Sequence, residues 1–151
     1  MPSDVEKNIT VNRKARHNYF VLQTYEAGIS LVGTEVKACR QNKVSLVDSY
    51  AVIHNNEVWL VSANIASYEH GNINNHEPTR RRKLLLNRSE IRKLLIKTLE
   101  KGCTLIPLRM YFKNGKVKVE LAAAQGKKSY DKRETIAKKD FERSQERKIK
   151  Y

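Results

Sequence analysis

The feature that most constrains the fold is Asn114-Gly115, which lies between two runs of alternating apolar and polar residues. An Asn-Gly pair favours left-handed backbone at two successive positions, and a type I′ hairpin turn requires that conformation. The run after the turn has a period of two, which is typical of a strand with one buried face. The residues expected to face the core are Val117, Val119 and Leu121. Those expected to face outward are Lys116, Lys118 and Glu120.

A second hairpin is predicted in residues 49–68. Two apolar runs there are joined by Asn55-Asn56. Asparagine tolerates left-handed backbone, so a tight turn fits this position. The two hairpins together indicate an antiparallel β protein.

Residues 18–40 also have a strand-like composition, rich in β-branched and aromatic side chains. Ala27-Gly28 is interpreted as a turn that interrupts this run. Gly33, inside the same pattern, predicts a bulge or bend of the kind by which small barrels turn corners. The whole segment is therefore expected to contribute strands.

One clear helix is predicted over residues 88–101. Apolar residues recur there at helical spacing and form one stripe: Ile91, Leu94, Leu95 and Leu99. Asn87 is a favourable N-cap, and Glu90 three residues later completes a capping box. Gly102 is expected at the C′ position, where it ends the helix.

Strands in hairpins, with one helix before the last hairpin and no alternation of strands with helices, predict a mainly β fold. An OB-fold-like antiparallel barrel fits the number and order of the elements. An open β-sandwich is the alternative. Residues 1–125 are expected to form this domain, and residues 126–151 to form a separate C-terminal tail.

Charge is the most informative property of the composition. The chain carries 30 Lys and Arg against 16 Asp and Glu, a net charge of +14. Residues 126–151 hold ten basic and five acidic side chains, a net charge of +5, which leaves +9 on residues 1–125. The predicted barrel is therefore basic in its own right. A positive field of this size attracts polyanions, and we interpret it as evidence for a nucleic-acid-binding protein; an effect on solubility alone is the alternative.

No motif favours catalysis. The four histidines are scattered, and no phosphate-binding loop, nucleophile elbow or glycine-rich nucleotide motif is found. Cys39 and Cys103 form no CxxC pair, so no disulfide framework, metal site or cofactor is expected. No membrane span and no secretory signal are found, which indicates a cytoplasmic protein.

Binding chemistry is concentrated in a basic segment before the first predicted strand. It contains Arg13, Lys14, Arg16 and His17, followed by Tyr19 and Phe20. Basic side chains neutralise phosphates, and aromatic rings stack on unpaired bases. The alternative is a solvated basic arm, with its aromatic neighbours in the core.

A second basic stretch, RRRKLLLN, runs from Arg80 to Asn87. Its three leucines either lie buried together or leave at least one exposed. The residues alone favour burial.

Ordered phrases along the chain resemble a known family. They are NRKARHNYFVLQTYEAGISLVGTEVKACR, VDSY, EPTRRRKLLLN, GKVKV and GKKSYDKRE. In order and spacing they are similar to the SmpB family of SsrA-binding proteins, the bacterial partners of transfer-messenger RNA (tmRNA) in trans-translation. The resemblance implies a non-enzymatic OB-fold barrel that binds the tRNA-like domain of tmRNA. It also implies a tail that probes the empty decoding site and mRNA channel of a stalled ribosome, and a protein that is monomeric off the RNA.

The resemblance also implies roles for individual residues. The RNA-contacting glutamate of the EAG motif corresponds to Glu26, the leucine and asparagine of the KLLLN motif to Leu85 and Asn87, and a hairpin lysine to Lys118. It moves our interpretation of Leu85 from the core to an RNA-facing position. The family's tail signature corresponds to Gly126, Lys127, Lys128, Asp131, Lys132 and Arg133.

Two positions depart from the family pattern. Arg81 stands where proline is usual, and Gln125 where a basic residue is common. A generic OB-fold binder of single-stranded RNA and a metal-dependent nuclease remain the alternative functions.

The tail is predicted to be disordered in the free protein and helical when bound. Its apolar residues are too sparse for a packed helix, and charge pairs four residues apart stabilise a helix only weakly. Gly126 is expected to act as a flexible exit from the barrel, and Tyr130 to stack on an exposed base near the decoding site.

Overall fold

The computed structural model describes residues 5–68 and 75–127. The strands are β1 Glu6–Val11, β2 Tyr19–Ile29, β3 Val44–Ser45, β4 Tyr50–His54, β5 Glu57–Val61, β6 Asn64–Ile65, β7 Arg82–Leu85, β8 Cys103–Lys113 and β9 Lys116–Gly126. The helices are α1 Arg13–Asn18, α2 Gly33–Arg40 and α3 Arg88–Thr98. Strands dominate the described part of the chain, as the sequence predicted.

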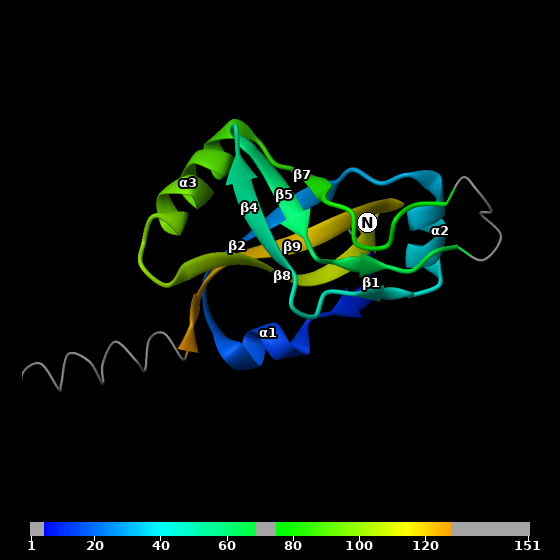
Figure 1. Ribbon diagram of the computed structural model, residues 1–151, viewed down its shortest axis with the longest axis horizontal. Helices are drawn as coiled ribbons and strands as arrows, with labels where there is room; N and C mark the ends of the chain where they lie inside the picture. Colours follow the sequence, from blue (N-terminus) through cyan, green and yellow to red (C-terminus); the bar gives the residue numbers. More distant parts are fainter. Residues whose placement is uncertain (1–4, 69–74, 128–151) are drawn as a thin grey trace, which may run out of the picture.

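The main sheet closes on itself. Its strand order is β1-β8-β4-β5-β7-β2-β9, and β8 also pairs with β9, so the strands from β8 round to β9 form a closed antiparallel barrel (Figure 1). β1 pairs with β8 outside this ring, and β3 and β6 form a small separate sheet. The predicted barrel is therefore confirmed, and the open sandwich is not the fold that forms.

Both predicted hairpins are present. The backbone φ angles are 52° at Asn114 and 77° at Gly115, between β8 and β9. They are 51° at Asn55 and 62° at Asn56, between β4 and β5. Left-handed backbone at both turn positions is what the sequence predicted, and it sets the register of each strand pair.

The alternation in β9 also holds. Val119 and Leu121 are fully buried, and Val117 packs against the edge of the core. The outward residues Lys116, Lys118 and Glu120 are exposed or half-buried.

Helix α3 lies across one end of the barrel and α2 lies near the other (Figure 1). The capping box of α3 is confirmed, because Asn87 accepts a hydrogen bond from the Glu90 backbone and Glu90 from the Asn87 backbone. The helix ends at Thr98 and not at residue 101, and Gly102, with a φ angle of 79°, belongs to the turn before β8. In the predicted stripe, Leu94 is buried, but Leu95 and Leu99 are 39% and 79% exposed.

The expectation of one helix was wrong, because residues 33–40 form α2 and not a bulged strand. The buried residues of α2 are Glu35, Ala38 and Cys39, spaced three and four apart as one face of a helix requires. The Glu35 carboxylate also accepts a hydrogen bond from the Val32 N–H and so caps the first turn. Tertiary packing here outweighs the β preference of the surrounding residues.

The basic segment before Tyr19 forms helix α1, which was not predicted and whose N-cap Asn12 accepts a hydrogen bond from the Ala15 N–H. One further sequence interpretation was wrong. Ala27-Gly28 makes no turn, because β2 continues through it to Ile29.

The boundary between barrel and tail lies later than expected. Gly126 is the last residue of β9, is paired with Tyr19 of β2, and donates its N–H to the Gly102 carbonyl. It is therefore part of the sheet and not a flexible exit. Lys127 follows, with its ammonium nitrogen 5.3 Å from the centroid of the Phe20 ring. Lys128, Tyr130, Asp131, Lys132 and Arg133 lie outside the described residues, as does the prediction for the conformation of the tail.

Candidate nucleic-acid interface

Three of the residues expected to contact RNA share one outer face of the barrel. Gly28 of β2 is in register with Lys118 of β9 on one side and with Leu85 of β7 on the other. Glu26 lies two residues before Gly28 and therefore points to the same face. The fold thus brings Glu26, Leu85 and Lys118 together from three strands; we call this set the outer-face site.

The three leucines of the KLLLN motif alternate in exposure. Leu84 is 1% exposed, Leu85 is 51% exposed, and Leu86 packs at the edge of the core. Gly28 leaves room for the Leu85 side chain, because a Cβ atom at position 28 would lie 3.2 Å from the Leu85 Cβ. The preference for burial that the residues alone gave is therefore wrong for Leu85, whose exposure agrees with the outward position that the resemblance implied.

Asn87 has a clear structural role. Its side-chain oxygen accepts hydrogen bonds from the Glu90 N–H at 3.0 Å and from the Ser89 hydroxyl at 2.8 Å. It is exposed and follows Leu85 by two residues at the start of α3. The cap fixes Asn87 at the edge of the outer-face site.

Glu26 is held by hydrogen bonds from β8. The Tyr111 hydroxyl donates to Oε2 at 2.6 Å, and the Lys113 ammonium lies 3.0 Å from Oε2 and 3.3 Å from Oε1. The Tyr111 hydrogen bond, together with Lys113, lowers the pKa of the Glu26 carboxyl although burial opposes this. Glu26 is thus an ionised acceptor on the surface of a basic protein.

Tyr111, Lys113 and Arg109 are partners of this site that the sequence reasoning missed. The Arg109 guanidinium stacks over the Tyr111 ring, 3.9 Å from its centroid. It donates to Glu120 of β9 at 3.1 Å and to Glu6 of β1 at 2.9 Å. The alternation of β8 placed all three residues on one face, and that signal was available in the sequence.

Helix α1 covers the neighbouring part of the same outer surface. Ala15 packs against Ile106, Leu108 and Ala122 of β8 and β9. The four basic residues predicted to bind RNA, Arg13, Lys14, Arg16 and His17, are all exposed. Burial of Ala15 therefore turns the charged residues of α1 outward.

The α1 residues divide between two surfaces. Arg16 reaches toward the outer-face site and lies 3.7 Å from Glu120. Lys14 turns the other way and pairs with Asp48 at 3.3 Å. Lys14 and His17 line a separate groove.

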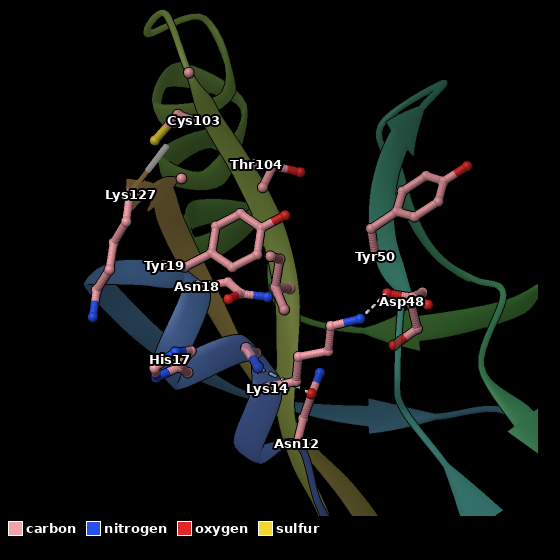
Figure 2. A pocket seen from close by; sticks show the side chains of 15 residues that line it. Asn12, Lys14, His17, Asn18, Tyr19, Asp48, Tyr50, Cys103, Thr104 and Lys127 are labelled. Atoms are coloured by element: carbon pink, nitrogen blue, oxygen red, sulfur yellow. Dashed lines mark hydrogen bonds and ion pairs between the residues drawn. The ribbon is translucent and has the colours of Figure 1, made fainter. Parts of the chain in front are cut away.

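This groove has a volume of about 790 Å³ and lies between α1, the start of β4 and the first residues of β8. Figure 2 shows Tyr19 and Tyr50 on either side of it, with Thr104 near its upper end. Gly126 and Lys127 also line it, so the groove lies where the chain leaves the barrel. We call it the tail-root groove.

The basic run RRRK has one buried member, Arg82, whereas Arg81 is exposed and Arg80 and Lys83 are half-buried. The Arg82 side chain is fully buried and donates to the Glu35 carboxylate and to backbone carbonyls such as Ala63 and Pro78. Arg80 donates to the same carboxylate. Burial alone would raise the pKa of Glu35, but hydrogen bonds from Arg80, Val32 and Arg82 outweigh it and keep that pKa low. Arg82 is therefore unable to contact RNA.

Other classes of site find no support in the part of the chain that the structure describes. No group of three or more His, Cys, Asp or Glu side chains there could hold a metal ion. Within the same residues, no helix is long and apolar enough to cross a bilayer.

The chain is similar to known proteins over almost its whole length. The model of the SmpB protein family matches residues 9–151. The SsrA-binding protein of Desulforudis audaxviator (strain MP104C) is 58% identical over 143 residues, covering 95% of this chain and 94% of the relative. That of Trichodesmium erythraeum (strain IMS101) is 56% identical over 146 residues, covering 96% and 94%. A solved structure described as "tmRNA-SmpB: a journey to the center of the bacterial ribosome" is 48% identical, with a TM-score of 0.66, and covers 83% of this chain and 85% of that one.

Proposed function

The chain belongs to the SmpB family, and from this premise we propose that it binds the tRNA-like domain of tmRNA and brings it to stalled bacterial ribosomes. There it supports trans-translation, in which the stalled peptide is tagged and the ribosome is released. The protein is an RNA-binding protein and not an enzyme. It acts in the cytoplasm, where ribosomes work, and is monomeric off the RNA.

The observation that carries this proposal is the outer-face site. Glu26, Leu85 and Lys118 are far apart in sequence, yet they meet on one exposed face. An apolar side chain beside a lysine and a fixed carboxylate offers three kinds of contact: stacking on a sugar or base, a phosphate contact, and acceptance of a base N–H. Asn87, at the edge of the site, adds an amide.

The basic residues of α1 contribute phosphate contacts around this site. Arg13 and Arg16 lie on the exposed side of α1, and Arg16 is directed toward Glu120 next to the site. Lys14 and His17 contact RNA as well, from the tail-root groove. These contacts are electrostatic, so they add affinity without reading sequence.

We assign the tmRNA-binding barrel to the residues up to Gly126, one residue beyond the expected 1–125, and the ribosome-binding tail to the residues after it, within the expected 126–151. Two findings support this division: β9 ends at Gly126, and the following 25 residues of the family match are rich in basic side chains. In the tail, Lys127, Lys128, Lys132 and Arg133 contact ribosomal RNA phosphates and Tyr130 stacks on a base.

Truncation tests the division. A chain that ends at Lys127 retains all of β9 and is expected to bind tmRNA with affinity near that of the full chain, yet to fail in tagging stalled peptides. Filter binding and a reconstituted tagging reaction measure the two properties. Full tagging by the truncated chain would contradict the proposed role of the tail.

Capture from a bacterial lysate tests the function as a whole. The full chain, recovered with its bound RNA and sequenced, is expected to be enriched in tmRNA over other RNAs of similar abundance. Recovery of RNAs in proportion to their abundance would instead indicate a generic single-strand binder.

A further inference from the structure

Like charges face each other across the outer surface of the barrel. Glu26 of β2 is directly opposite Glu120 of β9 in the antiparallel register. Such a pair destabilises a sheet unless each carboxylate has its own partners. Glu120 is paired with Arg109 and Arg16, whereas Glu26 is paired with Lys113 and hydrogen-bonded by Tyr111. The two carboxylates therefore have separate sets of partners.

The partners of Glu26 form a connected series across the sheet. Arg109 is held by Glu6 and Asn8 of β1 and by Glu120 of β9, each at 2.9–3.1 Å. Its guanidinium plane covers the Tyr111 ring, which is 2% exposed. The buried ring directs its hydroxyl to Glu26 Oε2. Tyr111 thus has little freedom, and its hydrogen bond limits the freedom of the carboxylate.

The two carboxylate oxygens of Glu26 differ in their remaining capacity to accept hydrogen bonds. Oε2 receives both the Tyr111 hydroxyl at 2.6 Å and the Lys113 ammonium at 3.0 Å. Among the described residues, Oε1 receives only the longer Lys113 contact at 3.3 Å. A carboxylate oxygen has two acceptor sites, so Oε1 retains capacity for another donor. The Glu26 side chain is 38% exposed, which leaves it within reach of a ligand.

We infer that Tyr111, packed under Arg109, is a positioning residue that fixes the Glu26 carboxylate with Oε1 free to accept an amino or imino N–H from an unpaired RNA base. The inference rests on the proposed function. A fixed anion repels phosphates, so this point of a basic surface discriminates among RNAs while the surrounding cations attract them all.

The charged groups around Glu26 are consistent with this role. Tyr111 and Lys113 face it from β8, and Lys118 and Glu120 from β9. Burial and the hydrogen bond to Glu26 raise the pKa of the Tyr111 hydroxyl, so it remains a donor at neutral pH. Removal of that hydroxyl would raise the pKa of Glu26 toward its ordinary value, because the Tyr111 hydrogen bond is the largest effect that lowers it.

Tyr111→Phe tests the inference, because it removes the hydroxyl and keeps the buried ring. The variant is expected to bind the tRNA-like domain of tmRNA about tenfold more weakly, as for loss of an ordered contact to a charged group. Its affinity for an unrelated single-stranded RNA should not fall. The Glu26 carboxyl, followed by carbon-13 NMR in the free protein, should titrate at higher pH. Tyr25→Phe is the matched control, because that neighbouring ring packs against the inner core and its hydroxyl should affect neither measurement.

The outcomes separate this inference from the proposed function. If Glu26→Gln weakens tmRNA binding but Tyr111→Phe changes neither affinity nor the Glu26 titration, the positioning role of Tyr111 is wrong and the function stands. If the unmodified chain shows no preference for tmRNA, the function is wrong, and an unchanged Glu26 titration in Tyr111→Phe would still overturn the positioning role. An upward shift in the titration with unchanged tmRNA affinity would contradict the contact of Glu26 Oε1 with a base.

Discussion

Two glutamates of this protein lie among basic partners, and they differ in how far water reaches them. Glu35 and Arg82 have fully buried side chains, with Arg80 as a second cation. Glu26 is 38% exposed, and its partner Lys113 is 22% exposed. The buried cluster joins α2 to β7 and the preceding loop, whereas the exposed cluster keeps one oxygen available. We therefore expect similar residue types to stabilise the structure where they are buried and to recognise RNA where they are exposed.

The largest expected effect comes from breaking the buried cluster. Glu35→Gln leaves the Arg82 charge buried without a carboxylate, and loss of one partner from a buried pair costs about 3–5 kcal/mol of folding free energy. Urea unfolding measures the change. Glu26→Gln is the matched control at the exposed cluster, where an ion pair contributes less than about 1 kcal/mol. Equal destabilisation by the two variants would contradict the comparison.

Low pH should also reduce the stability of the fold mainly through the buried cluster. The pKa of Glu35 in the folded protein lies below its ordinary value of 4.5. Its contribution to stability is therefore fully present above that value and is lost as the pH falls through the lower, folded-state pKa. The stability difference between the unmodified chain and Glu35→Gln is expected to shrink as the pH falls below 4.5, as measured by urea midpoints. A stability difference between the two proteins that grows at low pH would contradict a lowered pKa of Glu35.

Leu84 and Leu85 allow the same comparison between a buried and an exposed residue. Leu84→Ala is expected to cost about 2–5 kcal/mol of stability, because its side chain is buried in the core. Leu85→Ala removes a half-exposed side chain, so it should leave stability within about 1 kcal/mol but weaken tmRNA binding about tenfold. Thermal unfolding and filter binding measure the pair. An unchanged tmRNA affinity in Leu85→Ala would contradict a contact between Leu85 and RNA.

The smallest effect is expected at Lys118. Lys118→Met removes one phosphate contact. This should reduce the slope of log affinity against log salt concentration by about one and lower the affinity for all RNAs by the same factor. Lys97→Met is the control, because Lys97 lies on α3 and pairs with Glu100. The same change in slope for both variants would indicate a diffuse field and not a phosphate site at Lys118.

The sequence predicted the barrel because its turns are local signals. Asn55-Asn56 and Asn114-Gly115 determine backbone conformation by themselves, and the alternation in β9 follows from the second turn. Helix α2 was missed because its buried face includes a glutamate, whose partners Arg80 and Arg82 lie some 45 residues later in the chain. A charged residue that is paired across such a distance looks like a surface residue in the sequence.

The outer-face site could be predicted only in part. The family resemblance supplied Glu26, Leu85 and Lys118 as separate positions, and only the strand register shows that they lie together. The composition also overestimates the positive charge available to bind RNA, because the Arg82 side chain is buried inside the protein. The alternation of β8 could have placed Tyr111 on the outer face, but the hydrogen bond from its hydroxyl to Glu26 depends on the fold and could not be predicted.

The most direct test of the outer-face site is competition binding with the full chain. The tRNA-like domain of tmRNA is displaced by an unrelated single-stranded RNA of equal length, with the unmodified protein and with Glu26→Ala. We expect the unmodified protein to prefer the tRNA-like domain strongly, and we expect Glu26→Ala to lose most of this preference without losing affinity for the unrelated RNA. Equal affinities for the two RNAs, or a preference that Glu26→Ala leaves intact, would contradict this expectation.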